Sequence, residues 1–227
     1  MRKTVLITGA TRGIGRAVAN LLADDWHILV GGTTPDGVAK VAAELPSAEP
    51  FVADLTSEEA TRDAAQRITH LDAIVHSAGI VGHGTSEAHT REQWRRMFEI
   101  NVIAVSHLTA LLLPHLREAQ GQIVVINSKG GFTAGPGGGM YSASKHALRA
   151  WTDVLRQEER GRIRVTSIHP GRTDTDMQRE QQSAEGREGY DGERVLAVNS
   201  VASAVKFALD ATPDASVETL TVYPARW

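Results

Sequence analysis

The chain has 227 residues, of which 41% are hydrophobic and 22% are charged, and its formal net charge is −3. This length and composition suit one globular domain with a sizeable core. Its dispersed lysines and arginines exclude a basic nucleic-acid footprint, and the lack of cysteine excludes disulfides, thiolate catalysis and Cys-ligated zinc.

Short apolar segments rich in β-branched residues alternate with longer amphipathic segments along the whole chain. Strands are predicted at residues 4–8, 28–31, 50–53, 73–77, 122–127, 164–168 and 220–223. Helices are predicted at residues 13–23, 35–45, 57–68, 91–117, 142–159 and 201–211. Apolar strands separated by helices are typical of a parallel sheet covered on both faces. We therefore expect an α/β fold: a single doubly wound Rossmann-like domain over residues 1–227 with a parallel seven-stranded sheet.

The polar segment 173–199 interrupts this alternation and carries Gly186, Gly189 and Gly192. A long irregular insertion of this kind is usually a functional lid or disordered. It follows the carboxyl end of a predicted strand, where open α/β sheets bind ligands, so we expect a substrate lid here. Four arginines are candidates for meeting an acidic substrate, although most are expected to be solvated: Arg172, Arg179, Arg187 and Arg194.

The longest apolar stretch, residues 108–113, is far shorter than a membrane span. The apolar run at the N-terminus is also too short for a signal peptide. With the lack of cysteine, these features predict a cytoplasmic protein that binds neither membrane nor nucleic acid. No His, Asp or Glu grouping has convincing ligand spacing, so we expect no metal.

A glycine-rich turn, Thr8-Gly9-Ala10-Thr11-Arg12-Gly13-Ile14-Gly15, joins the first predicted strand to the first predicted helix. Glycines permit close approach of backbone to phosphate, and a helix N-terminus favours negative charge. The strand before the turn and the helix after it supply the context that such a motif needs. The turn therefore predicts a nucleotide phosphate site.

The second predicted strand ends in Val30-Gly31-Gly32-Thr33-Thr34 and carries no acidic residue there. A site that prefers NAD commonly places a carboxylate at this point, on the adenosine 2′-hydroxyl. Arg12 instead offers a cation to a 2′-phosphate, and Thr33 offers a hydroxyl. The sequence therefore predicts NADP as the cofactor, with NADPH preferred over NADH.

Tyr141 and Lys145 stand four residues apart in Tyr-Ser-Ala-Ser-Lys, near the start of a predicted helix. Residues at this spacing project from the same helical face. A nearby ammonium favours the phenolate, which lowers the pKa of a tyrosine from its usual value of about 10. The pair therefore indicates acid–base chemistry near neutral pH.

These motifs, taken in order, resemble the short-chain dehydrogenase/reductase family, of the NADP-preferring type with Gly-x-x-x-Gly-x-Gly and Tyr-x-x-x-Lys. The resemblance covers residues 4–222. It rests further on Asp54-Leu55, His76-Ser77-Ala78-Gly79, Asn101, Ser128 and Pro170-Gly171. It implies an oxidoreductase that transfers a hydride between NADP(H) and a small carbonyl or alcohol substrate.

The resemblance also implies catalytic roles. Tyr141 would be the general acid/base, Ser128 would hydrogen-bond the substrate oxygen, and Lys145 would lower the Tyr141 pKa and bind the nicotinamide ribose. Asn101 would hold a water that links Lys145 to a proton relay. Asp54 would contact the adenine, and Thr175 the carboxamide. The expected cofactor-binding residues are Gly9, Thr11, Arg12, Gly13, Ile14, Gly15, Thr33, Asp54, Leu55, Ser77, Ala78, Gly79, Tyr141, Lys145, Pro170, Gly171, Thr173 and Thr175.

Some positions depart from the family pattern. His76 stands where the family usually has Asn, and it either stabilises the turn after its strand or titrates and makes activity pH-sensitive. The glycine-rich loop before Tyr141 is either a plain flexible loop or an open pocket wall that admits bulky substrates. Candidate pocket residues are Phe132, Met140, Met177 and Tyr190.

Two alternative functions stay open. A non-catalytic nucleotide-binding regulator would have no need of all four of Asn101, Ser128, Tyr141 and Lys145. A family epimerase or dehalogenase would keep the site and change the reaction, but the dehalogenase relatives lack the glycine turn and use Arg in place of Lys. The resemblance further implies a homodimer or homotetramer, formed through the long helix near Asn101 and the helix after Tyr141.

Overall fold

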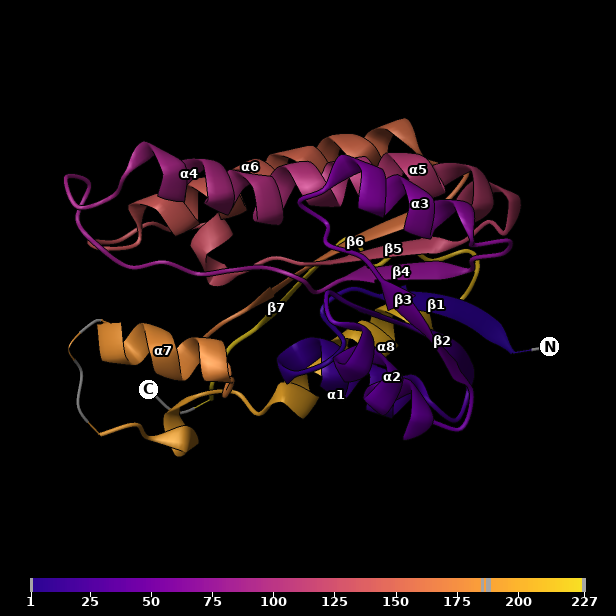
Figure 1. The fold of residues 1–227 in the computed structure, drawn as a ribbon, viewed down its shortest axis with the longest axis horizontal. Helices are drawn as coiled ribbons and strands as arrows, with labels where there is room; N and C mark the ends of the chain where they lie inside the picture. The colour runs from indigo at the N-terminus through magenta and orange to yellow at the C-terminus, as the bar shows by residue number, and fades with distance from the viewer. Residues whose placement is uncertain (1, 185, 187–188, 226–227) are drawn as a thin grey trace.

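The computed structural model describes residues 2–184, 186 and 189–225, which form a sheet between two layers of helices (Figure 1). Within these residues seven parallel strands make one sheet, in the order β3-β2-β1-β4-β5-β6-β7. The strands are β1 (Lys3–Ile7), β2 (Trp26–Gly32), β3 (Ala48–Val52), β4 (Ala73–His76), β5 (Gln122–Ile126), β6 (Arg164–Pro170) and β7 (Thr219–Val222). The chain winds outward from β1 in one direction and from β4 in the other, so the predicted doubly wound sheet is confirmed.

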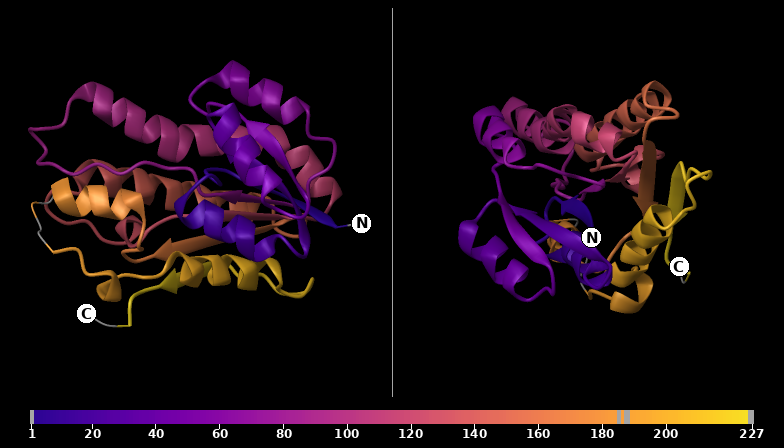
Figure 2. Two further views of the ribbon diagram at one scale, coloured as in Figure 1. Left: turned by 60° about the horizontal axis from the view of Figure 1, so that its bottom comes forward. Right: turned by 90° about the vertical axis from the view of Figure 1, so that its right-hand side faces the viewer.

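The helices cover both faces of this sheet, as Figure 2 shows from two further sides. One face carries α1 (Gly13–Leu22), α2 (Pro35–Ala43) and α8 (Val198–Leu209). The other carries α3 (Glu58–Gln66), α4 (Arg91–Phe98), α5 (Ala104–Glu118) and α6 (Gly139–Glu158). The register pairs Ile7 with Val30 on one side and with Val75 on the other, which brings the carboxyl ends of β1, β2 and β4 together.

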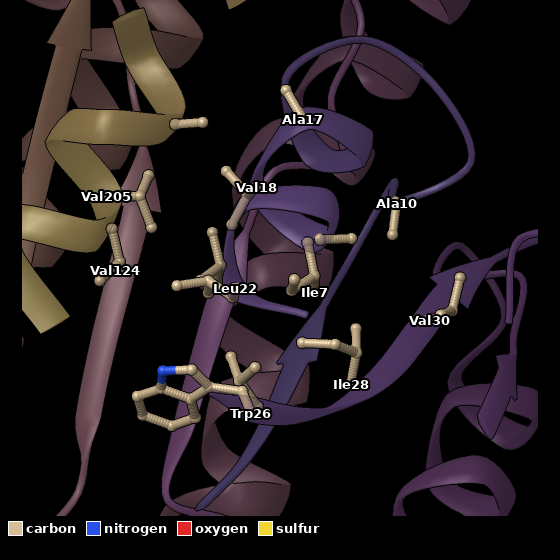
Figure 3. Packing of buried hydrophobic residues seen from close by; sticks show 14 of the residues in the cluster. Ile7, Ala10, Ala17, Val18, Leu22, Trp26, Ile28, Val30, Val124 and Val205 are labelled. Carbon is tan, nitrogen blue, oxygen red and sulfur yellow. The ribbon is translucent and has the colours of Figure 1, made fainter. Parts of the chain in front are cut away.

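Successive strand residues enter opposite cores because side chains alternate across a sheet. Val5 and Ile7 of β1 pack on the side of α1, whereas Leu6 packs on the side of α5. Figure 3 shows the first core, in which Leu22 of α1 and Val205 of α8 meet the sheet. Burial on both faces explains why the inner strands, such as β4 and β5, are nearly continuous apolar runs.

The prediction of one continuous helix over residues 91–117 is wrong in its middle. A π-helical turn, η1 (Glu99–Ile103), separates α4 from α5 and contains Asn101. Such a turn inserts an extra residue into the helical repeat, and π-turns occur frequently at functional sites. Here it carries the buried Asn101 side chain toward the loop after β4.

The helical stretch Arg91–Glu118 is long and apolar enough to span a membrane by length and composition, which the sequence did not lead us to expect. Leu108, Leu112 and Leu116 are fully buried against the sheet. The stretch is therefore a core helix.

The prediction that segment 173–199 is irregular is wrong in part. It contains α7 (Asp176–Ala184) and η3 (Gly192–Arg194), and α8 begins at Val198. Thr175 caps α7 by accepting a hydrogen bond from the Gln178 amide at 3.1 Å. The helix was missed because its polar sequence shows no apolar stripe. Residue Arg187, with 185 and 188, lies outside the described residues.

Candidate active site

The predicted site residues lie at the carboxyl edge of the sheet, around the ends of β1, β4 and β5. Thr8 joins the end of β1 to the loop after β4, because its Oγ1 accepts hydrogen bonds from the amides of Ser77 and Ala78 at 3.0 and 3.1 Å. The sequence did not assign Thr8 a role, although it opens the glycine motif. The bonds hold the glycine turn against the loop after β4.

The glycine turn has the backbone conformation that its sequence predicts. Gly9 and Gly13 have φ values of 66° and 57°, which favour glycine. A Cβ on Gly9 would lie 3.0 Å from the Cα of Ala78, and a Cβ on Gly15 would collide with the carbonyl oxygen of Gly9. At Gly9 and Gly15 the backbone is thus packed too closely for a side chain.

The first turn of α1 presents backbone N–H groups toward the edge of the sheet. Its N-cap residue is Arg12, whose side chain makes no capping hydrogen bond to the described helix. The first N–H groups of a helix have no partner within the helix and favour an anion. The turn therefore fits the phosphates of a dinucleotide.

A cavity of about 170 Å³ opens beside this turn, at the ends of β1, β2 and β3. Six predicted cofactor residues line it: Gly9, Thr11, Thr33, Asp54, Leu55 and Ala78. The remaining lining residues, which the sequence missed, are Thr8, Gly31, Gly32, Phe51, Ala53, Thr56 and Ile100. The glycine pair Gly31-Gly32 at the end of β2 could have indicated the cavity from the sequence. No sequence pattern pointed to Ile100, which reaches the cavity from η1. The apolar and hydroxyl lining fits an adenosine.

Asp54 lies at the rim of this cavity in a tight turn. Its Oδ1 accepts hydrogen bonds from the Thr56 amide at 3.0 Å and from the Thr56 hydroxyl at 2.8 Å. These bonds hold the pKa of Asp54 below its ordinary value, so the carboxylate is ionised at neutral pH. An ionised acceptor here is compatible with the predicted adenine contact, which stays a prediction.

Tyr141, Ser128 and Lys145 lie together between β5 and α6. Helix α6 begins at Gly139, earlier than predicted, so Tyr141 and Lys145 both lie on it. Ser128 follows the end of β5 and hydrogen-bonds Tyr141. Lys145 is buried, with its Nζ 5.9 Å from the centre of the Tyr141 ring and 3.1 Å from the carbonyl oxygen of Ile126, to which it donates.

The protonation states of the pair differ from the sequence-based expectation. Burial raises the pKa of Tyr141, and the hydrogen bond to Ser128 only partly opposes this effect. The predicted lowering by Lys145 is therefore wrong for the protein alone. Burial also lowers the pKa of Lys145 to about 8. At neutral pH the site holds a protonated phenol, ready to donate, beside an ammonium.

The side chain of Asn101 makes hydrogen bonds to Ile80 and to Ser144. Its Oδ1 accepts from the Ile80 amide at 2.9 Å, and its Nδ2 donates to the Ile80 carbonyl and to Ser144 Oγ at 3.0 and 3.1 Å. Ser144 in turn donates to the Tyr141 carbonyl at 2.8 Å. A Cβ on Gly79 would lie 3.2 Å from Asn101 Oδ1 and 4.0 Å from Lys145 Nζ. Asn101 thus links the loop after β4 to the catalytic helix, and its water-holding role stays a prediction.

The residues after β6 connect the edge of the sheet to α7. Gly171, directly after Pro170, donates to the Val222 carbonyl at 2.8 Å, and Thr173 Oγ1 donates to the Gly171 carbonyl at 3.1 Å. A Cβ on Gly13 would lie 3.5 Å from Thr175 Cγ2. Thr175 therefore lies against the glycine turn, and its expected contact with a carboxamide stays a prediction.

Arg12 faces α7 in this structure. Its Nη1 lies 4.0 Å from Oδ2 of Asp176, and the two side chains are 67% and 60% exposed. A pair so exposed and so distant contributes little, so the guanidinium is available to an anion at the turn.

His76 has neither of the roles considered for it. Its Nε2 lies 2.8 Å from Thr109 Oγ1 on α5, so it ties β4 to that helix instead of stabilising the turn. Burial lowers the pKa of His76 to about 3, which keeps the ring neutral throughout the physiological range.

A larger hollow of about 890 Å³ lies at the opposite edge of the sheet, beside the amino ends of β1 and β2. Arg2, Lys3 and Trp26 contribute to its lining, and none of the predicted site residues do. Within the part of the chain that the structure describes, no three His, Asp or Glu side chains gather as metal ligands would.

The glycine turn opens onto the same edge of the sheet as the Tyr141 cluster, an arrangement typical of dinucleotide-dependent oxidoreductases. The family model for short chain dehydrogenases matches residues 3–186. The chain therefore belongs to the short-chain dehydrogenase family.

Similar proteins agree with this assignment. An uncharacterised oxidoreductase of Listeria monocytogenes is 31% identical over 238 residues, covering 98% of this chain and 96% of that protein. The serine 3-dehydrogenase of Rhizobium radiobacter is 33% identical over 185 residues, covering 78% and 74%. The alcohol dehydrogenase of the archaeon Thermococcus sibiricus, solved in complex with 5-hydroxy-NADP, has a TM-score of 0.90 at 26% identity and covers 100% of this chain and 98% of that one.

Proposed function

We propose that this protein is an NADP-dependent oxidoreductase that reduces a ketone or aldehyde, or oxidises the corresponding alcohol. The observation that carries the proposal is the hydrogen bond between Ser128 and Tyr141, with the Lys145 ammonium 5.9 Å from the centre of the Tyr141 ring. A regulator that only binds a nucleotide has no use for this pair. Similarity to an alcohol dehydrogenase and to a serine 3-dehydrogenase supports the reaction class.

The chain's own residues divide the work. NADPH supplies the hydride when bound, and negative charge then develops on the substrate oxygen. Ser128 donates a hydrogen bond to that oxygen, and Tyr141 gives it a proton. Lys145 stabilises the phenolate left behind. The amides of the glycine turn bind the phosphates, while Arg12 and Thr33 receive the 2′-phosphate.

Replacing Arg12 should change the choice of cofactor. Arg12→Ala removes a charged hydrogen bond worth about 1.5–3 kcal/mol, so the KM for NADPH should rise roughly 10-fold to 100-fold. The KM for NADH should stay nearly constant, because NADH lacks the 2′-phosphate. Steady-state kinetics with both cofactors measure this. Arg95→Ala is the matched control, since Arg95 is also 67% exposed and loosely paired, with Glu92 at 3.8 Å. Equal effects on both cofactors would argue against the 2′-phosphate contact.

The rate of carbonyl reduction should fall as the pH rises through about 8, the lowered pKa of Lys145. Below this pH the buried amine is charged and stabilises the Tyr141 phenolate; above it the charge is lost. Tyr141 itself, with its raised pKa, stays protonated over the same range. A pH profile of kcat for NADPH oxidation measures the effect. A rate that stays constant well above pH 8 would show that the charge on Lys145 is not needed.

The substrate can be identified by assaying a panel of candidate compounds. The serine 3-dehydrogenase relative makes serine a member of the panel beside simple ketones and aldehydes. Two lid arginines expected as possible acid-binding groups are paired within the lid: Arg179 with Asp174 at 2.8 Å, and Arg194 with Asp191 at 3.2 Å. Arg172 also has an interaction partner.

The homodimer or homotetramer that the family implies is also a proposal. Ile103 on η1 and Val154 on α6 are 52% and 51% exposed, and these two elements pack together. Large apolar side chains in such positions support contact with a second copy. Light scattering on the purified protein tests it. We also propose a cytoplasmic location, supported by the lack of cysteine.

A further inference from the structure

The loop that carries Ser128 is held at several points by residues without a part in the proposed mechanism. Ser128 Oγ accepts a hydrogen bond from the Gly130 amide at 3.0 Å. With one lone pair occupied, the single hydroxyl proton is left to donate to the Tyr141 oxygen or, once a substrate is bound, to the substrate oxygen. The direction of this proton therefore depends on how the Ser128 backbone is fixed.

His169 fixes that backbone. It lies in β6 beside the end of β5 and is fully buried, with its Nδ1 3.0 Å from the Ser128 carbonyl oxygen. A carbonyl only accepts, so Nδ1 carries the proton. Nε2 lies 2.8 Å from Ser167 Oγ, whose hydroxyl donates to it. Burial lowers the pKa of His169, in agreement with this neutral form.

A second contact holds the far end of the loop. Arg149 Nη1 donates to the Gly131 carbonyl at 3.1 Å, and its guanidinium lies 4.7 Å from the centre of the Phe132 ring. The Phe132 ring lies 4.2 Å from that of His169. Phe132, a candidate pocket residue from the sequence, thus packs between β6 and α6. The loop is fastened at Ser128, Gly131 and Phe132.

We propose that His169 is a positioning residue for the reaction at Ser128: its hydrogen bond to the Ser128 carbonyl orients the peptide and aims the serine hydroxyl at the reacting oxygen. Arg149 supports the same loop from α6. The inference rests on the proposed function, because it gives Ser128 a catalytic part. The two ring nitrogens of His169 are bonded to Ser167 and Ser128, and His169 does not line the cavity beside the glycine turn.

The test uses two replacements of His169 in wild-type and Ser128→Ala proteins, with single-turnover NADPH oxidation as the readout. His169→Asn keeps an N–H near the position of Nδ1, whereas His169→Leu removes it. His169→Leu should lower the rate roughly 10-fold to 100-fold, the scale of a small misplacement of a reacting group. His169→Asn should restore most of the rate, and the KM for NADPH should stay constant in both.

The Ser128→Ala background separates positioning from general damage. If His169 acts through Ser128, His169→Leu causes no further loss there. An equal loss in both backgrounds would overturn the inference. If His169→Leu fails to fold, Arg149→Met takes its place in the test. Arg149→Met should lower the rate of NADPH oxidation by less than His169→Leu, and this loss should also be absent in the Ser128→Ala background. Full activity of Ser128→Ala alone would contradict the catalytic part proposed for Ser128, whereas full activity of His169→Leu beside an impaired Ser128→Ala contradicts only this inference. Failure of every variant and of the wild type to consume NADPH would contradict the proposed function itself.

Discussion

Tyr141→Phe should abolish turnover while the protein still binds NADPH. The change removes only the phenol oxygen, which is the proton donor to the substrate oxygen and the partner of Ser128. Loss of a general acid lowers a rate by about 10²–10⁴-fold. The ring still fills its place on α6, so folding and the nucleotide cavity should be preserved. Steady-state kinetics and NADPH titration measure the two effects separately.

The matched control for this change is Tyr223→Phe. Tyr223 is 37% exposed and lies beneath the Lys129 amine, outside the Tyr141 cluster. Its hydroxyl has no part in the proposed chemistry, so this variant should keep most of its activity. Unchanged turnover in Tyr141→Phe would refute the acid–base mechanism.

Gly15→Ala should damage cofactor binding and stability together. The added methyl group would collide with the Gly9 carbonyl oxygen and lie 3.2 Å from the Cα of Ala10, so rigid backbone has to move. Such overpacking costs about 1–3 kcal/mol of unfolding free energy. The displaced turn would also move its amides away from the phosphates. We therefore expect the Kd for NADPH to rise at least about 10-fold, which corresponds to 1.4 kcal/mol.

Gly135→Ala is the control for this experiment, because a Cβ at Gly135 would meet nothing within 4 Å and its φ is not positive. It should leave both the unfolding free energy and the NADPH affinity close to wild type. Urea unfolding and fluorescence titration provide the two numbers. Normal NADPH binding by Gly15→Ala would show that the glycine turn is not the phosphate site.

Local sequence predicted the sheet and much of the site because their signals lie in short segments. The inner strands β1, β2, β4 and β5 each contain an apolar run, and the glycine turn stands between a strand and a helix. Tyr141 and Lys145 share a helix face by spacing alone. Ser128 came from the family resemblance, and its bond to Tyr141 agrees with it.

Contacts between distant residues explain what was missed. The π-helical turn accompanies the bonds that Asn101 makes to Ile80 and Ser144, and these partners are 21 and 43 residues away. His76 pairs with Thr109 across 33 residues. The raised pKa of Tyr141 arises from burial, which the spacing of Tyr and Lys does not reveal.

The most direct test of the central claim is NADPH oxidation by the purified protein against a panel of ketones and aldehydes, followed by the loss of NADPH absorbance. The account predicts oxidation with at least one carbonyl compound, slower oxidation of NADH with the same compound, and none by Tyr141→Phe. Tight binding of NADPH without consumption across the whole panel would contradict it, and would favour a protein that only binds the nucleotide.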